Sequence, residues 1–184
     1  MRGLILLADG FEDTEALTTR DVLIRSGLEI VTSSLGANRQ VVSSFGITLL
    51  SDISFGQIGD PFQYDFLILP GGGRGTQNLK NHAGVKSLVT TFYENNKLIC
   101  AICAAPSILG QLGFLRGINY TCFAGFDKGI EGNFTANEVE VDGNIITARS
   151  MHYSVDFALA IIEKLQGKEQ KEKVLEGLNG LTLK

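Results

Sequence analysis

The apolar residues of this chain fall first into short continuous runs. A short apolar run is typical of a strand in a sheet. Where the run is continuous, it indicates a strand that is covered on both faces. The pattern predicts four strands, at Leu4–Ala8, Leu28–Thr32, Asp65–Pro70 and Leu98–Ile102. It also predicts two hairpins, one over Val41–Ser51 around Gly46 and one formed by Val139–Val141 with Ile145–Ala148.

Between these runs, apolar residues recur at helical spacing. The first predicted helix begins in the acidic residues Glu12, Asp13 and Glu15 and ends at Ser26-Gly27, where a glycine is a common terminator. Further helices are predicted over Val85–Tyr93, after Cys103 through Leu112, over Phe157–Leu165, and around the charged run Lys168–Lys173. Strands that alternate with helices predict an α/β sandwich around a mostly parallel sheet, built as one domain over residues 1–184.

In sheets of this class, functional groups lie at the carboxyl ends of the strands. Three segments of the chain hold that position: Asp9–Glu15, Gly71–Gly75 and Cys103–Pro106. We therefore expect the chemistry of the protein in these three loops.

Composition narrows the classes of function. The chain has 184 residues, is 44% hydrophobic and carries a net charge of −4. This charge argues against non-specific nucleic-acid binding, which needs clustered cations. No run approaches the roughly 20 apolar residues of a membrane span, and Leu4–Ala8 is too short for the core of a signal peptide. We expect a cytoplasmic protein that binds neither nucleic acid nor membranes.

The cysteines are the first candidates for chemistry. Cys100, Cys103 and Cys122 are an odd number, and free thiols are expected. Cys103 lies where a strand gives way to a helix with Pro106 near its first turn, so the helix dipole favours its thiolate. The turn is mechanically similar to the nucleophile elbow of hydrolases. A small buried thiol is an equally good reading of that position. Cys100 lies inside the strand and is expected in the core, with no second ligand pair to make a metal site.

The glycines and the acids are weaker signals. The consecutive glycines Gly71, Gly72 and Gly73 can turn backbone N–H groups toward an anion, although a flexible turn is the commoner reason for such a run. Thr76 stands where a dinucleotide-binding motif needs glycine. Glu15 by itself is best explained as an acid that stabilises the start of a helix.

Four segments together resemble the ThiJ/PfpI superfamily, in the branch of the Parkinson-disease protein deglycase. These segments are LLADGFEDTE (6–15), DFLILPGG (65–72), AICAAP (101–106) and DFALAI (156–161). Their order and spacing are specific, and the resemblance covers almost the whole chain. It implies a flavodoxin-like sandwich with helices on both faces of the sheet.

The resemblance also implies roles for particular residues. Cys103 would be the reactive elbow cysteine, and Glu15 would hydrogen-bond its sulfur; in its protonated form Glu15 would donate to the thiolate and depress the pKa of the thiol. The backbone of Gly71, Gly72 and Ala104 would form the pocket for an anion or oxyanion. Members are usually homodimers, and Arg25 matches a basic residue near the dimer interface.

Departures from the family concern histidine. The family often has a site histidine some twenty residues past the cysteine, where this chain reads TCFAGF (121–126). Proteolytic relatives place a histidine directly after the cysteine, where this chain has Ala104, so a protease is not expected. We hypothesise that His152 partly replaces the missing group; without the resemblance, His152 would be read as structural and His82 as a surface residue.

Two classes of function remain. The leading one is cofactor-independent processing of small reactive carbonyls such as methylglyoxal, of the glyoxalase or deglycase type, with Cys103 as nucleophile and no metal. The rival is an oxidative-stress sensor or protective protein that uses oxidation of Cys103 stoichiometrically. Amidotransfer or thiamine-related metabolism is suggested only by the names of relatives and ranks last.

Overall fold

The central strand shows how the chain builds two cores. In the computed structural model, which describes residues 1–180, β1 (Arg2–Leu7) is buried along almost its whole length. Successive side chains of a strand point to opposite faces. Leu4 and Leu6 accordingly join one hydrophobic cluster, whereas Ile5 and Leu7 join the other. A continuous apolar run is therefore needed, because both faces of the sheet are covered.

Seven strands form the main sheet. The order is β10 (Val139–Asp142), β11 (Ile145–Ala148), β7 (Leu98–Ile102), β6 (Phe66–Leu69), β1, β2 (Glu29–Ser34) and β5 (Ile53–Ser54). Every neighbouring pair is parallel except the β10–β11 hairpin. The prediction of a mostly parallel sheet is confirmed.

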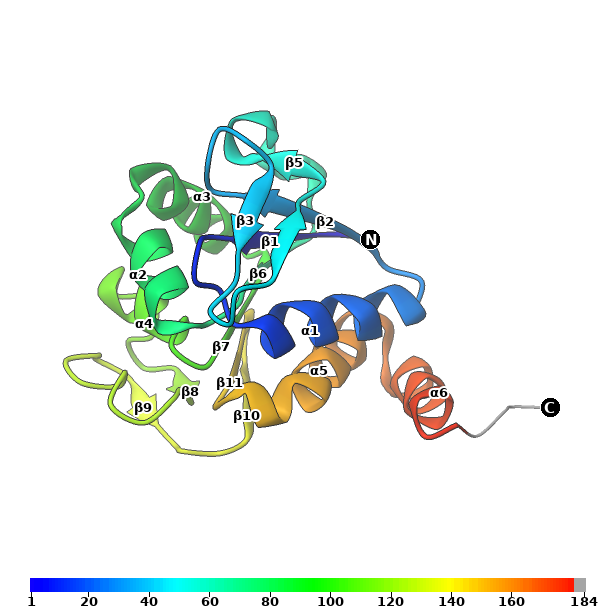
Figure 1. The fold of residues 1–184 in the computed structure, drawn as a ribbon. Helices are drawn as coiled ribbons and strands as arrows, with labels where there is room; N and C mark the ends of the chain where they lie inside the picture. Colours follow the sequence, from blue (N-terminus) through cyan, green and yellow to red (C-terminus); the bar gives the residue numbers. More distant parts are fainter. Residues whose placement is uncertain (181–184) are drawn as a thin grey trace.

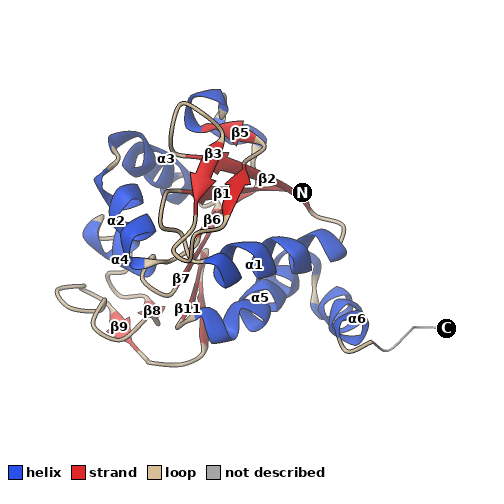
Figure 2. Ribbon diagram, in the orientation of Figure 1, coloured by secondary structure: helices blue, strands red, loops and turns tan. Residues whose placement is uncertain are grey.

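Helices cover both faces of this sheet (Figures 1 and 2). On one face lie α1 (Asp13–Arg25) and α5 (Ser154–Gln166), with α6 (Lys168–Leu178) against α5. On the other face lie α2 (Gly73–Asn81), α3 (Ala83–Glu94) and α4 (Pro106–Gln111). The flavodoxin-like sandwich is thereby confirmed.

Smaller elements lie outside the main sheet. The predicted hairpin is formed by β3 (Gln40–Val42) and β4 (Thr48–Leu50), and β8 (Asn119–Tyr120) pairs with β9 (Asn133–Phe134). Three short 3₁₀ helices cover Phe55–Gln57, Pro61–Gln63 and Met151–Tyr153. Within residues 1–180 no helix is long and apolar enough to cross a membrane. Residues 181–184 of the predicted domain lie outside the described part.

Two local predictions are wrong. The glycine-rich segment was expected as a loop through Gly75, but helix α2 already begins at Gly73. Glycine disfavours a helix interior, and tertiary contacts overcome this: Leu79 is buried, and the amide of Gly75 donates to the carbonyl of Gly10 at 3.0 Å. His82 is half-buried instead of on the surface, because its Nδ1 caps α3 by accepting from the amide of Val85 at 3.2 Å.

Candidate active site

Three neighbouring strands bring the predicted site residues together. Strands β1, β6 and β7 lie side by side and parallel, so their carboxyl ends meet at one edge of the sheet. Glu15 lies in the first turn of α1, shortly after β1. Gly71 and Gly72 follow β6, and Cys103 follows β7. This is the edge at which parallel sheets place their sites.

Cys103 forms a sharp turn between β7 and α4. Its φ angle is +63°, in the left-handed region that side-chain-bearing residues avoid. Such a conformation costs about 1–3 kcal/mol and persists only where its surroundings hold it. Here the amide of Cys103 donates to the carbonyl of Ala148, and its carbonyl accepts from the amide of Phe123, both at 2.8 Å. The backbone is thus strained as in a nucleophile elbow.

The three cysteines differ in exposure. All are free thiols, as predicted. Cys100 and Cys122 are fully buried, whereas Cys103 is half-buried. Cys100 is a core residue, as expected. Among these thiols, Cys103 is the one that a small molecule can reach.

Glu15 turns inward and is completely buried. Its Oε2 accepts a hydrogen bond from the amide of Gly71 at 2.7 Å. The carboxyl lies within hydrogen-bonding reach of the Cys103 thiol. Its Oε1 is buried and has no hydrogen bond of good geometry within the described residues, which leaves this oxygen to carry a proton.

Glycine at position 71 makes this approach possible. A Cβ there would lie 2.6 Å from Oε2 of Glu15 and 2.8 Å from Cβ of Cys103. Any larger residue would push the carboxyl and the thiol apart. Position 71 therefore requires glycine, because the side chains of Glu15 and Cys103 both lie close to its backbone.

Two amides face the thiol. The N–H groups of Gly72 and Ala104 hydrogen-bond toward the sulfur of Cys103 and favour its thiolate. This arrangement is also suited to an oxyanion formed next to the sulfur. The amide of Gly71, expected in the same pocket, donates to Glu15 instead. It orients the carboxyl, and Gly72 and Ala104 are left as the donors.

The buried pair has unusual acidity. Burial raises the pKa of the Glu15 carboxyl from 4.5 to about 7, against the hydrogen bonds from Cys103 and Gly71. Burial also raises the pKa of the Cys103 thiol, and an ionised Glu15 raises it further, whereas the two amides lower it. The ionised carboxylate therefore opposes the thiolate, and the lowering of the thiol pKa expected from protonated Glu15 stays a prediction. Protonated Glu15 can donate to the sulfur, and its own raised pKa keeps that form available near neutral pH.

The remaining candidates lie elsewhere. His152 is exposed in the 3₁₀ helix before α5, with its ring edge-on to Tyr153. None of the hydrogen bonds found in residues 1–180 joins it to Glu15 or Cys103. Arg25 is exposed and forms an ion pair with Asp21 at 2.8 Å. Within residues 1–180, no group of three or more His, Cys, Asp or Glu side chains is placed to hold a metal ion.

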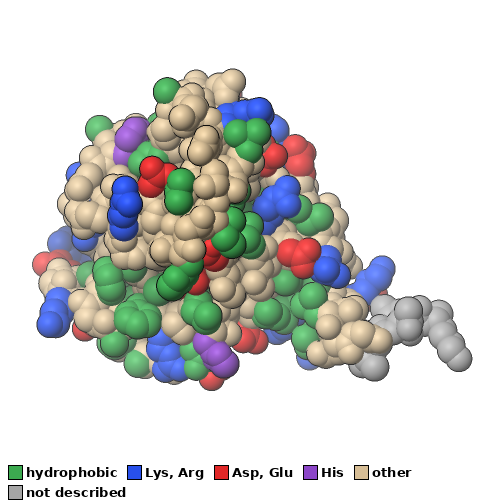
Figure 3. All heavy atoms as spheres, viewed as in Figure 1, with side chains coloured by type: hydrophobic (Ala, Val, Ile, Leu, Met, Phe, Trp, Pro, Cys, Tyr) green, Lys and Arg blue, Asp and Glu red, His purple; other side chains and the backbone are tan. Residues whose placement is uncertain are grey.

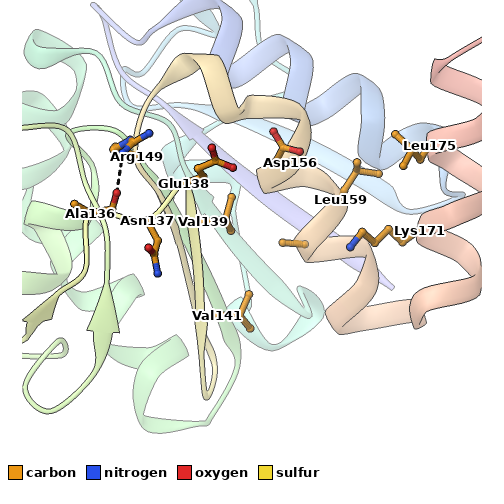
Figure 4. Close-up of a pocket in the computed structure, with 11 residues that line it drawn as sticks. Ala136, Asn137, Glu138, Val139, Val141, Arg149, Asp156, Leu159, Lys171 and Leu175 are labelled. Atoms are coloured by element: carbon orange, nitrogen blue, oxygen red, sulfur yellow. Dashed lines mark hydrogen bonds between the residues drawn. The ribbon is translucent and has the colours of Figure 1, made fainter.

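A large surface groove lies away from this pair. A groove of about 910 Å³ lies between β10, α5 and α6 (Figure 4). Its charged side chains have both signs, namely Glu138, Arg149, Asp156 and Lys171. None of the side chains that line it is a thiol or a hydroxyl, whereas the elbow pairs a thiol with a buried carboxyl.

Sequence reasoning missed one neighbour of the thiol. Segment 121–126 was read only for the absence of a histidine, whereas Phe123 is bonded through its amide to the carbonyl of Cys103. The signal available in the sequence was a pair of phenylalanines, Phe123 and Phe126, in an otherwise polar loop. Its proximity to the elbow depends on the fold.

Strand order, strained cysteine and buried carboxyl together define a mostly parallel α/β protein with a half-buried thiol beside a carboxyl at its sheet edge. Comparison with known proteins gives the family: the sequence pattern of the DJ-1/PfpI family matches residues 1–164. The chain belongs to this family.

Individual relatives agree. The chain is 33% identical over 178 residues to protein dj-1beta of Drosophila melanogaster, covering 95% of each chain. It is 28% identical to the glutathione-independent glyoxalase DJR-1.2 of Caenorhabditis elegans, covering 95% of this chain and 94% of the relative. The structure matches oxidized Toxoplasma gondii DJ-1 with a TM-score of 0.91 at 29% identity, covering 97% of each chain.

Proposed function

We propose that this protein converts small 2-oxoaldehydes, such as methylglyoxal, to 2-hydroxy acids without a cofactor. One observation carries the proposal: a buried carboxyl with a pKa of about 7 lies beside a half-buried thiol that receives two backbone amides. A general acid–base group works best when its pKa lies near the working pH. The glutathione-independent glyoxalase among the relatives supports the same reaction class.

The residues account for each step. The Glu15 carboxylate takes the proton of the Cys103 thiol, and the resulting thiolate attacks the aldehyde carbon. The carbonyl electron pair moves to oxygen, and that oxygen takes the proton from Glu15, which leaves a hemithioacetal and the Glu15 carboxylate. The amides of Gly72 and Ala104 stabilise the charge while it is on oxygen. The Glu15 carboxylate then removes the C–H proton of the former aldehyde carbon, and the hydroxyl proton on that carbon's oxygen passes to the neighbouring ketone oxygen. Glu15 returns its proton to the former ketone carbon, and the electron pair on the former aldehyde oxygen closes the carbonyl of a thioester. The resulting thioester is hydrolysed by water, which releases the 2-hydroxy acid and restores the thiol.

The overall reaction adds one water and needs no oxidant. The same thiol and carboxyl could act on glycated adducts, which is the deglycase form of this chemistry. In both forms the reacting group derives from a small carbonyl compound.

The first experiment measures lactate formed from methylglyoxal by the purified protein. Many turnovers per protein are expected, with none in Cys103→Ser and a large loss in Glu15→Gln. Glu94→Gln is the matched control, because Glu94 is exposed at the end of α3. Absence of turnover in the wild type, or full activity in Cys103→Ser, would refute the proposal.

A redox role is the second candidate, supported by the contrast in exposure among the cysteines. Cys103 is half-buried beside an acid, whereas Cys100 and Cys122 are sealed in the core. Oxidation should therefore begin at Cys103 and stop after about one equivalent of oxidant per protein if the thiol is a sensor. Mass spectrometry after titration with hydrogen peroxide distinguishes this from catalytic turnover.

We also propose that two copies associate through α1 and the β3–β4 hairpin. Figure 3 shows hydrophobic side chains between these elements. Phe45 is 81% exposed and Leu50 65% exposed, and further exposed apolar residues are Leu17, Ile24, Val42 and Ile47. Exposed apolar side chains that gather on one face mark an interaction surface, and Arg25 lies on α1.

The oligomeric state tests this proposal. Light scattering should give the mass of a dimer for the wild type and of a monomer for Phe45→Glu. Phe62→Glu is the control, because Phe62 is exposed on the 3₁₀ helix at Pro61–Gln63, outside the patch. A wild-type monomer at micromolar concentration would contradict the proposal.

A further inference from the structure

Two exposed aromatic side chains lie in the loop that contacts the elbow. Phe123 is 47% exposed and Phe126 is 36% exposed, with ring centroids 6.5 Å apart in an edge-to-face arrangement. Figure 3 shows hydrophobic side chains gathered over the part of the molecule where β8 and β9 lie. Exposed phenylalanines near a reactive group call for an explanation beyond packing.

The backbone ties this pair to the thiol-bearing residue. The amide of Phe123 donates to the carbonyl of Cys103 at 2.8 Å. The amide of Phe126 donates to the carbonyl of Phe123 at 3.0 Å, which closes a tight turn. Neighbouring Cys122 is fully buried, so the chain turns one side chain into the core and the next outward. The aromatic pair therefore lies at the same sheet edge as the elbow.

The turn that holds the pair contains one acid. Asp127 is the acid of this turn, and its Oδ1 accepts from the amide of Gly125 at 3.0 Å. The oxyanion donors, Gly72 and Ala104, reach the sulfur from the backbone of two other segments. A substrate thus meets hydrogen-bond donors at its reacting oxygen and apolar surface beside the elbow.

We propose that Phe123 and Phe126 select 2-oxoaldehydes whose substituent is apolar and aromatic, as in phenylglyoxal. This rests on the proposed function and names the substrate class of that site. The dicarbonyl end reaches Cys103, while the substituent packs against the two rings. Aromatic rings attract one another in edge-to-face and offset arrangements, beyond the gain from burying apolar area. A methyl substituent offers little of this contact.

Kinetics with matched substrates test the selection. Initial rates give kcat/KM for phenylglyoxal and for methylglyoxal, and we expect phenylglyoxal to be favoured about ten-fold, as partial burial of one ring allows. Phe123→Ala and Phe126→Ala should lose most of that ratio, mainly through KM. Their kcat/KM should fall much further for phenylglyoxal than for methylglyoxal.

Two variants serve as controls. Phe134→Ala removes a phenyl ring that is 38% exposed on β9 and packs against Tyr120, so the substrate ratio should not change. Phe123→Tyr keeps the aromatic face and should keep the ratio. A wild-type ratio near one, or an unchanged ratio in both Phe123→Ala and Phe126→Ala, would overturn the proposal.

A binding measurement separates this proposal from the proposed reaction. Calorimetry with Cys103→Ser compares mandelate with lactate, the hydroxy acids that the two substrates would give. Tighter binding of mandelate that is lost in Cys103→Ser/Phe123→Ala supports an aromatic subsite even if no substrate is turned over. Equal binding of the two acids in Cys103→Ser would refute the subsite, whatever the activity on methylglyoxal.

Discussion

Replacing Glu15 by glutamine should make the protein more stable at alkaline pH relative to wild type. Glutamine keeps the size of the side chain, and its carbonyl can still accept from the amide of Gly71, as Oε2 does at 2.7 Å. What it removes is a buried ionisable group. The variant therefore isolates the free-energy cost of ionising a carboxyl inside the fold.

The magnitude follows from the pKa of Glu15. In the folded state this pKa is raised from 4.5 to about 7, chiefly by burial. A raised carboxyl pKa means that the folded state holds the proton more tightly than the unfolded chain does. The resulting stabilisation is complete below about pH 4.5 and is lost as the pH rises through about 7. At about 1.4 kcal/mol per unit, the change is about 3 kcal/mol.

Urea unfolding of both proteins at pH 4.5, 6, 7 and 8.5, at one protein concentration, measures this difference. The unfolding free energy of Glu15→Gln relative to wild type should rise by about 3 kcal/mol over that range, with most of the rise between pH 5 and 7. Glu94→Gln, which changes an exposed carboxyl, should show almost no trend. A difference that is independent of pH, or that falls with pH, would refute the reasoning.

Three further predictions follow from the same structure. The kcat/KM for methylglyoxal should rise with pH through about 7, because below that value both Glu15 and the thiol are protonated, and a pH–rate profile of Glu15→Gln should lack this rise. Gly72→Ala should lower the free energy of unfolding by at least several kcal/mol or prevent folding, since φ is +88° and a Cβ would lie 2.3 Å from the carbonyl oxygen of Gly10. Thermal unfolding measures the loss, and Gly177→Ala is the control, because a Cβ at this position on α6 meets open space. Leu23→Ala should lower the unfolding free energy by about 2–5 kcal/mol in urea, because Leu23 is fully buried in the core.

Much of the fold was predictable because a strand that is buried on both faces needs a continuous run of apolar residues, and such a run is visible in the sequence. Strand β7 coincides with the predicted Leu98–Ile102, and both hairpins form as expected. Helix α2 was not predicted, because Gly73 and Gly75 in its first turn suppress the local helical signal. Its contacts with the loop after β1 supply the missing stability, and these contacts join residues far apart in the chain.

The acidic first turn of α1 shows the same limit within the site. Local reasoning assigned Glu12 and Glu15 alike to stabilising the helix start. Glu12 does so, because its Oε2 accepts from the amide of Glu15 at 2.7 Å and caps the helix. Glu15 instead points inward to Gly71 and Cys103. Only the resemblance to a family indicated this role from the sequence.

The sequence by itself determined the main strands and most of the helices, and that Cys103 falls at a strand-to-helix turn. These properties depend on the spacing of nearby apolar residues and glycines. The tertiary structure alone decided that Glu15, Gly71 and Cys103 meet, that Cys103 adopts a positive φ, and that burial raises the pKa of Glu15 to about 7. The physical reason is that these properties arise from the lateral order of β1, β6 and β7, which brings distant segments to one desolvated edge.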